Sequence, residues 1–469
     1  MDNLYNQLLA YGKSNMLPMH MPGHKRNPAF VMENPYCFDV TEVEGTDDLH
    51  HPEGLLKTEM EKAAVLFGAD RTFFLVGGST SGILTAVSAC TKRNGHILMA
   101  RNCHKSVYHA AYLLQLKQSY LVPEMNPATG IFCGITLEQV KQAWEENKEI
   151  DCVVITSPTY EGIVSPIREI AAFLHEKKIP LIVDEAHGAH LHFQKEAPES
   201  AVDAGADLVI QSLHKTLPAL TQTGLLHMND TGLVPVEEII RYEQIYQSSS
   251  PSYVLMASIG QCLDFLEKEK DAFLQYSVRL QRFYDKIKGL KNLRILNRED
   301  KDPGKVVITT EKTSFSGMDI MNLLRRDFHI ELEMSEPGYA LAMTSVADTE
   351  ESLERLAGAL MAVDGKIGEV SGEVCDGTQP KLYFSVSKAV TDAYTADKAE
   401  KKEVPLFRAA GHIAGEYVYL YPPGIPYLVP GEEITEEMVS LLLSLKDKGF
   451  SLRGMRDHRG EMILTAVLK

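Results

Sequence analysis

Long apolar runs, paired cysteines and an excess of basic residues are all missing from this sequence. No run of residues approaches the length needed to cross a bilayer, and the start, Met1–Gln7, lacks the basic and apolar regions of a signal peptide. The seven cysteines are scattered and never stand in C-x-x-C spacing, which favours reduced thiols in a cytoplasmic protein. The formal net charge of -17 argues against nucleic acid or an anionic membrane as the main partner.

The common motifs for metals and nucleotides are also missing. His50 and His51 stand close to two aspartates, but adjacent histidines point in different directions and lack helical i, i+4 spacing, so we expect no metal site. The turn at Gly77–Gly82 is not followed by G-K-[ST] and does not have the pattern G-x-G-x-x-G. The Walker and dinucleotide-binding fingerprints are therefore excluded.

Short apolar strands alternate with helical patterns through the first half of the chain. With 469 residues, of which 44% are hydrophobic, two or three domains are expected. The periodicity predicts strands at 72–76, 96–100, 119–122, 151–156, 180–184 and 207–211, and helices at 55–67, 83–90, 107–116, 137–147 and 166–178. This alternation predicts an α/β fold with a mostly parallel, doubly wound sheet, in which ligands bind at the carboxyl ends of the strands.

The pattern changes on either side of this region. Residues 1–50 look irregular, and beyond Gln222 a long helical periodicity over 253–288 leads to a small α+β domain. In that domain we expect strands at 305–310, 330–333 and 339–344 and helices at 319–325 and 349–363. A linker at 365–381 follows, and the Pro- and Gly-rich stretch 420–432 predicts a rigid extended loop. We therefore divide the chain into an N-terminal arm (1–50), a large domain (51–290), a small α+β domain (291–366) and a C-terminal α+β domain (367–469).

Polar residues collect where the predicted strands end. Lys215 follows the strand 207–211, and a lysine desolvated there can offer a neutral amine to a carbonyl; the alternative is a solvated lysine at a strand end. Gly77–Gly82 lies between a strand and a helix, which presents free N–H groups and hydroxyls to a phosphate, unless it is a plain strand-to-helix turn. The other polar residues at strand ends are Ser79, Thr80, His104, Thr159, Asp184, His187, Ser212 and His214.

Together these groups suggest pyridoxal phosphate as the cofactor. Lys215 would bind its aldehyde as a Schiff base, and Asp184 would pair with the pyridine nitrogen, which makes the ring an electron sink. His104 could lie against the ring. The spacing between Asp184 and Lys215 leaves room for one helix and one strand, so the two should be neighbours at the sheet edge. The phosphate would be held by hydroxyl and imidazole groups, those of Ser79, Thr80, Ser212 and His214.

Six stretches, in order along the chain, make it resemble the bacterial ornithine/lysine/arginine decarboxylase family, pyridoxal-phosphate enzymes of fold type I, the aspartate aminotransferase fold. The stretches are Met21–Lys25 (MPGHK), Gly77–Thr80 (GGST), Arg101–Ser106 (RNCHKS), Val183–Gly188 (VDEAHG), Ser212–Lys215 (SLHK) and Tyr421–Pro426 (YPPGIP). The chain is similar to the compact branch of this family, which lacks an N-terminal receiver-like domain.

The resemblance implies a role for each candidate residue. Lys215 would carry the cofactor, and Asp184 would bind its ring nitrogen. Ala186 and His187 would line the ring, although His187 could also be a packing histidine. His104 would stack on the ring and return a proton to the substrate. The implied phosphate contacts are Ser79, Thr80, Ser212 and His214.

The resemblance also implies the reaction, α-decarboxylation of arginine, lysine or ornithine to an amine for polyamine biosynthesis. Glu432, in the C-terminal loop, would suit the basic end of the substrate, and the N-terminal arm would cross a partner in a homodimer or higher homo-oligomer. Structural or phosphate-facing roles are expected for His24, Lys25 and Lys105.

Two alternatives to a decarboxylase stay open. One is an aminotransferase or another Cα-lyase on the same fold, for which an arginine of the small domain usually binds the substrate carboxylate. Candidates are Arg325, Arg326, Arg355 and Arg453. The other is a non-catalytic, cofactor-binding regulator, which is disfavoured by the acidic charge and by the lack of a DNA-binding segment.

Overall fold

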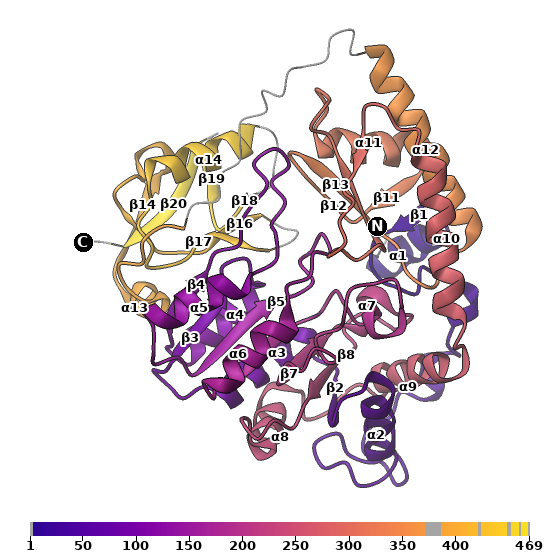
Figure 1. Ribbon diagram of the computed structural model, residues 1–469, viewed down its shortest axis with the longest axis horizontal. Coiled ribbons are helices and arrows are strands. Elements are labelled where there is room, and N and C mark those ends of the chain that lie inside the picture. The colour runs from indigo at the N-terminus through magenta and orange to yellow at the C-terminus, as the bar shows by residue number, and fades with distance from the viewer. Residues whose placement is uncertain (1–2, 371–385, 421–423, 448–451, 459–460, 468–469) are drawn as a thin grey trace.

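A seven-stranded sheet forms the centre of the large domain in the computed structural model, which describes residues 3–370, 386–420, 424–447, 452–458 and 461–467 (Figure 1). Strands β7, β6, β5, β3 and β4 are parallel, whereas β8 is antiparallel to both of its neighbours. The predicted mostly parallel α/β fold is confirmed. In sheet order the strands are β2 (Arg71–Leu75), β8 (Gly224–Met228), β7 (Leu208–Gln211), β6 (Leu181–Asp184), β5 (Cys152–Thr156), β3 (His96–Ala100) and β4 (Lys117–Leu121).

Amphipathic helices connect these strands and bury their apolar faces against the sheet. In α6, the buried residues Ile167, Ile170, Ala171 and Leu174 recur at helical spacing. Helix α2 ends at Gly68, whose φ of 72° lies in the left-handed region that glycine adopts without strain. The helices of this domain are α2 (Leu55–Phe67), α3 (Gly78–Cys90), α4 (Lys105–Leu113), α5 (Leu137–Glu146), α6 (Ile167–Glu176), α7 (Leu213–Thr216) and α8 (Val236–Tyr246), with a 3-10 turn at Leu191–Phe193.

Several elements differ from the expectations. Strand β8 and helix α8 lie where no regular element was expected beyond Gln222, and the long periodicity over 253–288 is two helices, α9 (Tyr253–Lys268) and α10 (Ala272–Ile287). Helix α3 begins at Gly78 rather than at residue 83, because its glycine and serine residues are weak helix formers that only the tertiary structure keeps helical. The expected irregular arm contains α1 (Leu4–Gly12), β1 (Leu17–Met19) and 3-10 turns at Pro28–Phe30 and Pro35–Cys37.

The small domain is an antiparallel sheet with helices packed on it. Its strand order is β12 (Met334–Glu336), β13 (Tyr339–Met343), β10 (Lys305–Thr309) and β9 (Arg294–Ile295). Helices α11 (Gly317–Phe328) and α12 (Glu350–Val370) belong to it, and a capping box between Ser316 and Asp319 fixes the start of α11. Strand β1 pairs in parallel with β11 (Ile330–Leu332), so the N-terminal arm is attached to this domain.

The C-terminal domain has its own apolar core and lies beside β4 and α4 in Figure 1. Helix α12 continues into the expected linker, and residues 371–381 lie outside the described residues. The stretch 420–432 is not all loop, because it contains a strand, β17. The elements are α13 (Ala393–Lys398), β14 (Lys401–Pro405), a 3-10 turn (Leu406–Arg408), β15 (Ile413–Ala414), β16 (Val418–Leu420), β17 (Pro426–Leu428), α14 (Glu436–Asp447), β18 (Leu452–Arg453), β19 (Arg456–His458) and β20 (Glu461–Val467).

A buried ion pair joins this C-terminal domain to the central sheet. Arg101 follows β3 and is fully buried; its Nη2 lies 3.2 Å from Oε2 of Glu432, and its Nη1 donates to the carbonyl of Pro426 at 2.7 Å. Glu432 also accepts a hydrogen bond from the backbone N–H of Val429. Both charges are thus paired and hydrogen-bonded, as buried charges must be.

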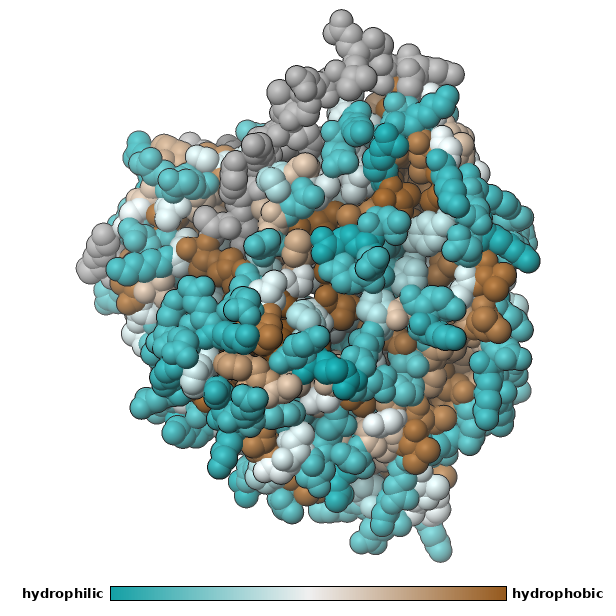
Figure 2. All heavy atoms as spheres, viewed as in Figure 1, coloured by the Kyte–Doolittle hydropathy of each residue, from teal (hydrophilic) through white to brown (hydrophobic). Residues whose placement is uncertain are grey.

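The surface is mostly polar. Figure 2 shows hydrophilic residues over most of the visible face, with apolar residues scattered between them. Among the residues that the structure describes, no helix is both long and apolar enough to cross a bilayer. The six cysteines in this part of the chain are free thiols, and Cys375 lies outside it.

Replacing Glu432 by alanine should weaken the attachment of the C-terminal domain. The change leaves the Arg101 guanidinium buried without its carboxylate, which typically costs about 3–5 kcal/mol. We expect a lower calorimetric unfolding temperature and faster proteolysis of the C-terminal domain. The adjacent, exposed Glu433 is the control, and Glu433→Ala should change stability by no more than about 0.5 kcal/mol. Equal effects of the two variants would contradict this account of the interface.

Candidate active site

A cavity of about 520 Å³ opens at the carboxyl ends of the parallel strands. Lys215 lies there on the single turn α7, directly after β7, and Asp184 is the last residue of the neighbouring strand β6. Burial lowers the pKa of Lys215, while the carboxylates of Asp184 and Glu333 oppose that shift. The amine is therefore more easily deprotonated than that of a solvated lysine. The cavity is also lined by Ser79, Thr80, His104, Ala186, His187, Ser212 and His214.

The glycine-rich turn forms one end of the cavity. Because α3 begins at Gly78, Ser79 and Thr80 lie in its first turn, where backbone N–H groups have no helical partner. The Oγ atoms of Ser79 and Ser212 are 2.6 Å apart, so the turns after β2 and β7 meet here. Gly78 has a φ of 70°, which a residue with a side chain rarely adopts. These N–H groups, hydroxyls and the dipole of a 13-residue helix suit a phosphate.

Asp184 is a buried carboxylate that lines the same cavity. It is 5% exposed, and its Oδ1 accepts one hydrogen bond, from the backbone N–H of Ala186 at 3.2 Å. Burial raises the pKa of Asp184, and nearby Lys215 acts in the other direction. A carboxylate with so few donors is ready to bind a cationic N–H group, such as a protonated ring nitrogen.

The three histidines of the cavity are held in their neutral form. Burial, reinforced by Lys215 and Lys105, lowers the pKa of His104 to about 3, and burial lowers that of His214 to about 4. Burial also lowers the pKa of His187, to well below its ordinary value. The backbone N–H of Ser106 donates to Nδ1 of His104, so the His104 proton is on Nε2.

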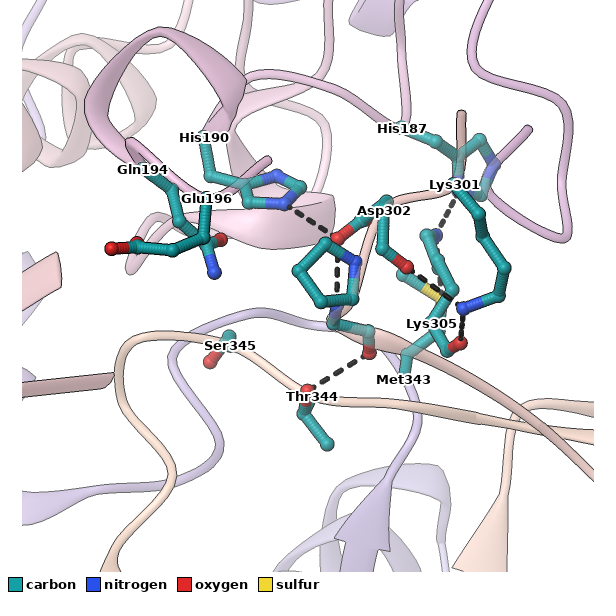
Figure 3. Close-up of polar contacts among 12 residues, drawn as sticks. His187, His190, Gln194, Glu196, Lys301, Asp302, Lys305, Met343, Thr344 and Ser345 are labelled. Atoms are coloured by element: carbon teal, nitrogen blue, oxygen red, sulfur yellow. Dashed lines mark hydrogen bonds and ion pairs between the residues drawn. The ribbon is translucent and has the colours of Figure 1, made fainter. Parts of the chain in front are cut away.

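His187 contacts a lysine that sequence reasoning missed. Its Nε2 lies 3.0 Å from Nζ of Lys215. Its Nδ1 lies 2.8 Å from Nζ of Lys305, the first residue of β10, as Figure 3 shows. The signal in the sequence that could have indicated Lys305 is its position as a charged residue at the start of a mostly apolar strand. Sequence reasoning also missed Glu161 and Glu333, which line the cavity after β5 and β11.

Glu432 does not lie with these residues. Its carboxylate pairs with Arg101, and Glu432 is not one of the residues that line the cavity in the described part of the chain. Ile425 of the same C-terminal segment does line it. Lys25 donates from Nζ to the carbonyl of Met343 at 2.7 Å, and His24 accepts from the backbone N–H of Arg26 at 3.0 Å, so both side chains bind other groups of the protein. Lys105 lies over the ring of Tyr419.

In the acidic, His-bearing stretch near residue 50, the side chains of Asp47 and His50 contact backbone groups. Asp47 accepts hydrogen bonds from the N–H groups of Gly54 and Leu56 and so holds the start of α2. His50 lies 2.8 Å from the carbonyl of Ser248. Within the described ranges, no group of three His, Cys, Asp or Glu side chains is arranged to hold a metal ion.

Comparison with known proteins identifies the family. The model for "Orn/Lys/Arg decarboxylase, major domain" matches residues 2–297, and that for the C-terminal domain of the same family matches residues 377–457. The chain belongs to the Orn/Lys/Arg decarboxylase family. The arginine decarboxylase of Halalkalibacterium halodurans is 32% identical over 97% of this chain and 95% of its own length. That of Bacillus subtilis is 32% identical over 98% of this chain and 96% of its own length.

A solved lysine decarboxylase has the same fold. The crystal structure of the Francisella novicida lysine decarboxylase LdcF superposes with a TM-score of 0.81 and is 20% identical, covering 99% of this chain and 80% of the other. The expected α/β fold, a fold type I enzyme with a mostly parallel central sheet, is confirmed, and the C-terminal domain that was expected to be α+β is rich in β-strands.

Acid should destabilise the folded protein through the buried histidines. An unfolded histidine takes up its proton near pH 6.5, whereas folded His104 does so at about 3, so stability is lost as the pH falls below about 6.5. Replacing His104 by glutamine should flatten the decline of the unfolding free energy between pH 6.5 and 4.5 by up to about 1 kcal/mol per pH unit. Exposed His51 is the control. Urea unfolding at several pH values measures the slopes, and equal slopes for His104→Gln and His51→Gln would refute the assignment.

Proposed function

We propose that this chain uses bound pyridoxal phosphate to decarboxylate a basic amino acid, with arginine as the first candidate. One observation carries the proposal: the Lys215 amine, the Asp184 carboxylate and a helix N-terminus share one cavity with two further carboxylates, Glu161 and Glu333. The similarity to arginine decarboxylases over nearly the full chain supports both the reaction class and the choice of arginine.

The residues present fit pyridoxal phosphate. Lys215 would bind the aldehyde, Asp184 would pair with the ring nitrogen, and His104, Ala186 and His187 would border the ring. The phosphate would be held by the first turn of α3 and the start of α7, through Ser79, Thr80, Ser212 and His214. When bound, the cofactor supplies an electron sink for the electron pair that is left when CO2 departs.

The side chains of this protein would supply orientation and proton transfer. Apolar residues on the cavity wall, including Phe132 and Ile425, limit the access of water, which favours loss of the charged carboxylate. Because a neutral imidazole is too weak an acid to protonate carbon, we propose that His104 takes up a second proton from solvent in the occupied site, passes a proton to the substrate carbon and returns to its neutral form. The neutral amine of Lys215 would then release the product.

Two carboxylates would recognise the basic end of the substrate. Glu333 accepts hydrogen bonds from Oη of Tyr160 at 2.6 Å and from the backbone N–H of Met21 at 2.9 Å. Glu161 is 3% exposed and accepts from Oη of Tyr339 at 2.5 Å. These donors fix the carboxylates in place, and a planar guanidinium with five N–H groups can use more of their acceptor sites than an ammonium can.

An aminotransferase is less well supported by the cavity. The four arginines considered for a substrate carboxylate are engaged elsewhere or exposed: Arg325 pairs with Glu331, Arg326 pairs with Asp327, and Arg355 donates to backbone carbonyls. Arg453 is exposed on β18. In the described part of the chain, no arginine lines the cavity.

We also propose that the protein acts in the cytoplasm as a homo-oligomer, and that its amine product serves polyamine biosynthesis. Helix α1 exposes Leu4, Tyr5 and Leu8, at 71%, 70% and 60% of their surfaces. A partner subunit that covered them would remove this apolar area from water. The scattered free thiols fit a reducing compartment.

A panel of basic amino acids tests the reaction. Arginine, lysine and ornithine are incubated with the cofactor-loaded enzyme, and released CO2 and the amine products are quantified. We expect stoichiometric CO2 and agmatine from arginine, without any requirement for a keto acid, and at least tenfold lower kcat/KM for lysine and ornithine because they lack the guanidinium group. Absence of CO2 from all three would refute the proposal, and dependence on a keto acid would favour an aminotransferase.

Borohydride reduction tests the position of the cofactor. It should fix the cofactor irreversibly on Lys215, and peptide mass spectrometry should find the adduct there. Lys215→Ala should lose both the adduct and at least 1,000-fold of the activity, because the nucleophilic amine is gone (an order-of-magnitude expectation). Lys105→Ala, which removes the lysine between the cavity residues His104 and Ser106, serves as the control and should keep the adduct on Lys215. An adduct on any other residue of the unmodified enzyme would overturn the assignment.

A further inference from the structure

Lys305 is a buried lysine that belongs to the small domain but reaches the cavity of the large one. It is 1% exposed. Its Nζ contacts Nδ1 of His187 at 2.8 Å and Sδ of Met343 at 3.5 Å, as the close-up in Figure 3 shows for the histidine. Burying an ammonium costs several kcal/mol unless it is compensated. A methionine would fill the same space at lower cost, so the amine of Lys305 calls for a functional explanation.

The two ring nitrogens of His187 face two different amines. Nδ1 contacts Lys305, and Nε2 contacts Lys215 at 3.0 Å. Since burial keeps this imidazole neutral, it carries one proton, and one nitrogen donates while the other accepts. An ammonium can only donate. If Lys305 is the protonated amine, Nδ1 must accept, Nε2 must carry the proton, and Lys215 must receive a hydrogen bond on its lone pair.

We propose that Lys305 is a positioning residue for the proposed decarboxylation: by donating to Nδ1 of His187 it fixes the histidine proton on Nε2, which holds the Lys215 amine in its unprotonated, nucleophilic form. The inference rests on the proposed function for the use made of that amine. The hydrogen-bond geometry of the three side chains does not depend on it.

The carboxylate beside Lys305 is more readily ionised than the carboxylate beside Lys215, which favours a positive charge on Lys305. Asp302 lies beside Lys305; His190 and the backbone N–H of Gly304 bind its Oδ1 at 3.2 and 2.7 Å, and its pKa is about 2. That carboxylate is therefore ionised at any working pH. Burial raises the pKa of Asp184, the carboxylate beside Lys215, so it holds its charge less firmly.

Other charged groups face the two amines. Burial lowers the pKa of Lys305 to about 7, Asp302 and Glu333 raise it, and Lys215 and Lys25 lower it further. Lys215 in turn faces Asp184 and Glu333. Glu333 acts on both lysines and does not discriminate between them. Asp302 favours a proton on Lys305 and Asp184 favours one on Lys215, and of these two carboxylates Asp302 is the more readily ionised.

Competitive labelling of the full-length, cofactor-free chain with trace acetic anhydride tests the inference, because only unprotonated amines react. The labelling of each lysine is followed from pH 5 to 10 by peptide mass spectrometry. In the unmodified chain, Lys215 should lose its proton at a lower pH than Lys305. In Lys305→Met, the His187 proton can move to Nδ1, Nε2 becomes an acceptor, and the titration midpoint of Lys215 should rise by about one pH unit. Its labelling at pH 6 should then fall roughly tenfold.

Two variants separate this role from packing. Lys305→Arg keeps a cationic donor and should restore most of the Lys215 titration. Lys301→Met removes another buried lysine, whose Nζ donates to the carbonyls of Asp302 and Lys305 without contacting His187, and it should leave the titration of Lys215 unchanged. An unchanged Lys215 midpoint in folded Lys305→Met would overturn the proposal. If that variant does not fold, the order of titration in the unmodified chain decides, and Lys305 deprotonating before Lys215 would overturn it.

Activity gives an independent comparison. With the cofactor bound, Lys305→Met should lower kcat at least tenfold at pH 7 and shift the pH profile upward, while Lys301→Met should not shift it. If the unmodified enzyme releases no CO2 from any basic amino acid but the labelling follows the expected order, the proposed function fails and the role of Lys305 stands.

Discussion

Keeping the amine of Lys215 unprotonated inside the protein is the constraint on which the rest of the site depends. An exposed lysine is an ammonium at neutral pH and cannot attack a carbonyl. Burial at the end of β7 weakens that preference, but Asp184, which the parallel sheet places on the next strand, strengthens it. The remaining groups of the cavity therefore have to offset a carboxylate whose proposed purpose is a different one, the binding of a cationic ring nitrogen.

The compensation comes from parts of the chain far from Lys215 in sequence. His187 follows β6, and Lys305 opens β10 of the small domain, so the protonation of one amine depends on contact between two domains. The C-terminal domain supports a second histidine, His104. Arg101, three residues before His104, is bound by Glu432 and by the carbonyl of Pro426, both of the C-terminal domain. The loop that carries His104 is thereby anchored at its base. Each of the two smaller domains thus supports one histidine of the cavity.

The sequence allowed the strand ends to be recognised but not these supporting contacts. Apolar runs such as 96–100 and 181–184 predict strands well because burial on both faces leaves a local signature, and turns that follow them concentrate the polar residues. The start of α3 was misplaced because glycine and serine obscure a helix that tertiary contacts impose. Lys305 and Glu432 were missed or misassigned because their partners lie more than a hundred and more than three hundred residues away, at His187 and Arg101. No local pattern encodes a partner at such a separation.

The pairing of β10 with β13 explains how the contact between Lys305 and His187 can be positioned accurately enough to fix which nitrogen of His187 carries the proton. Lys305 pairs with Met343, whose Sδ contacts the Lys305 amine and whose carbonyl accepts from Lys25 of the N-terminal arm. Two buried amines are thus held by one residue of a regular strand, and the arm is tied to the same domain by the pairing of β1 with β11. Groups on paired strands hold their positions better than groups on loops. Any displacement of the small domain would separate Lys305 from His187, so in this protein the docking of that domain and the nucleophilicity of Lys215 are a single property.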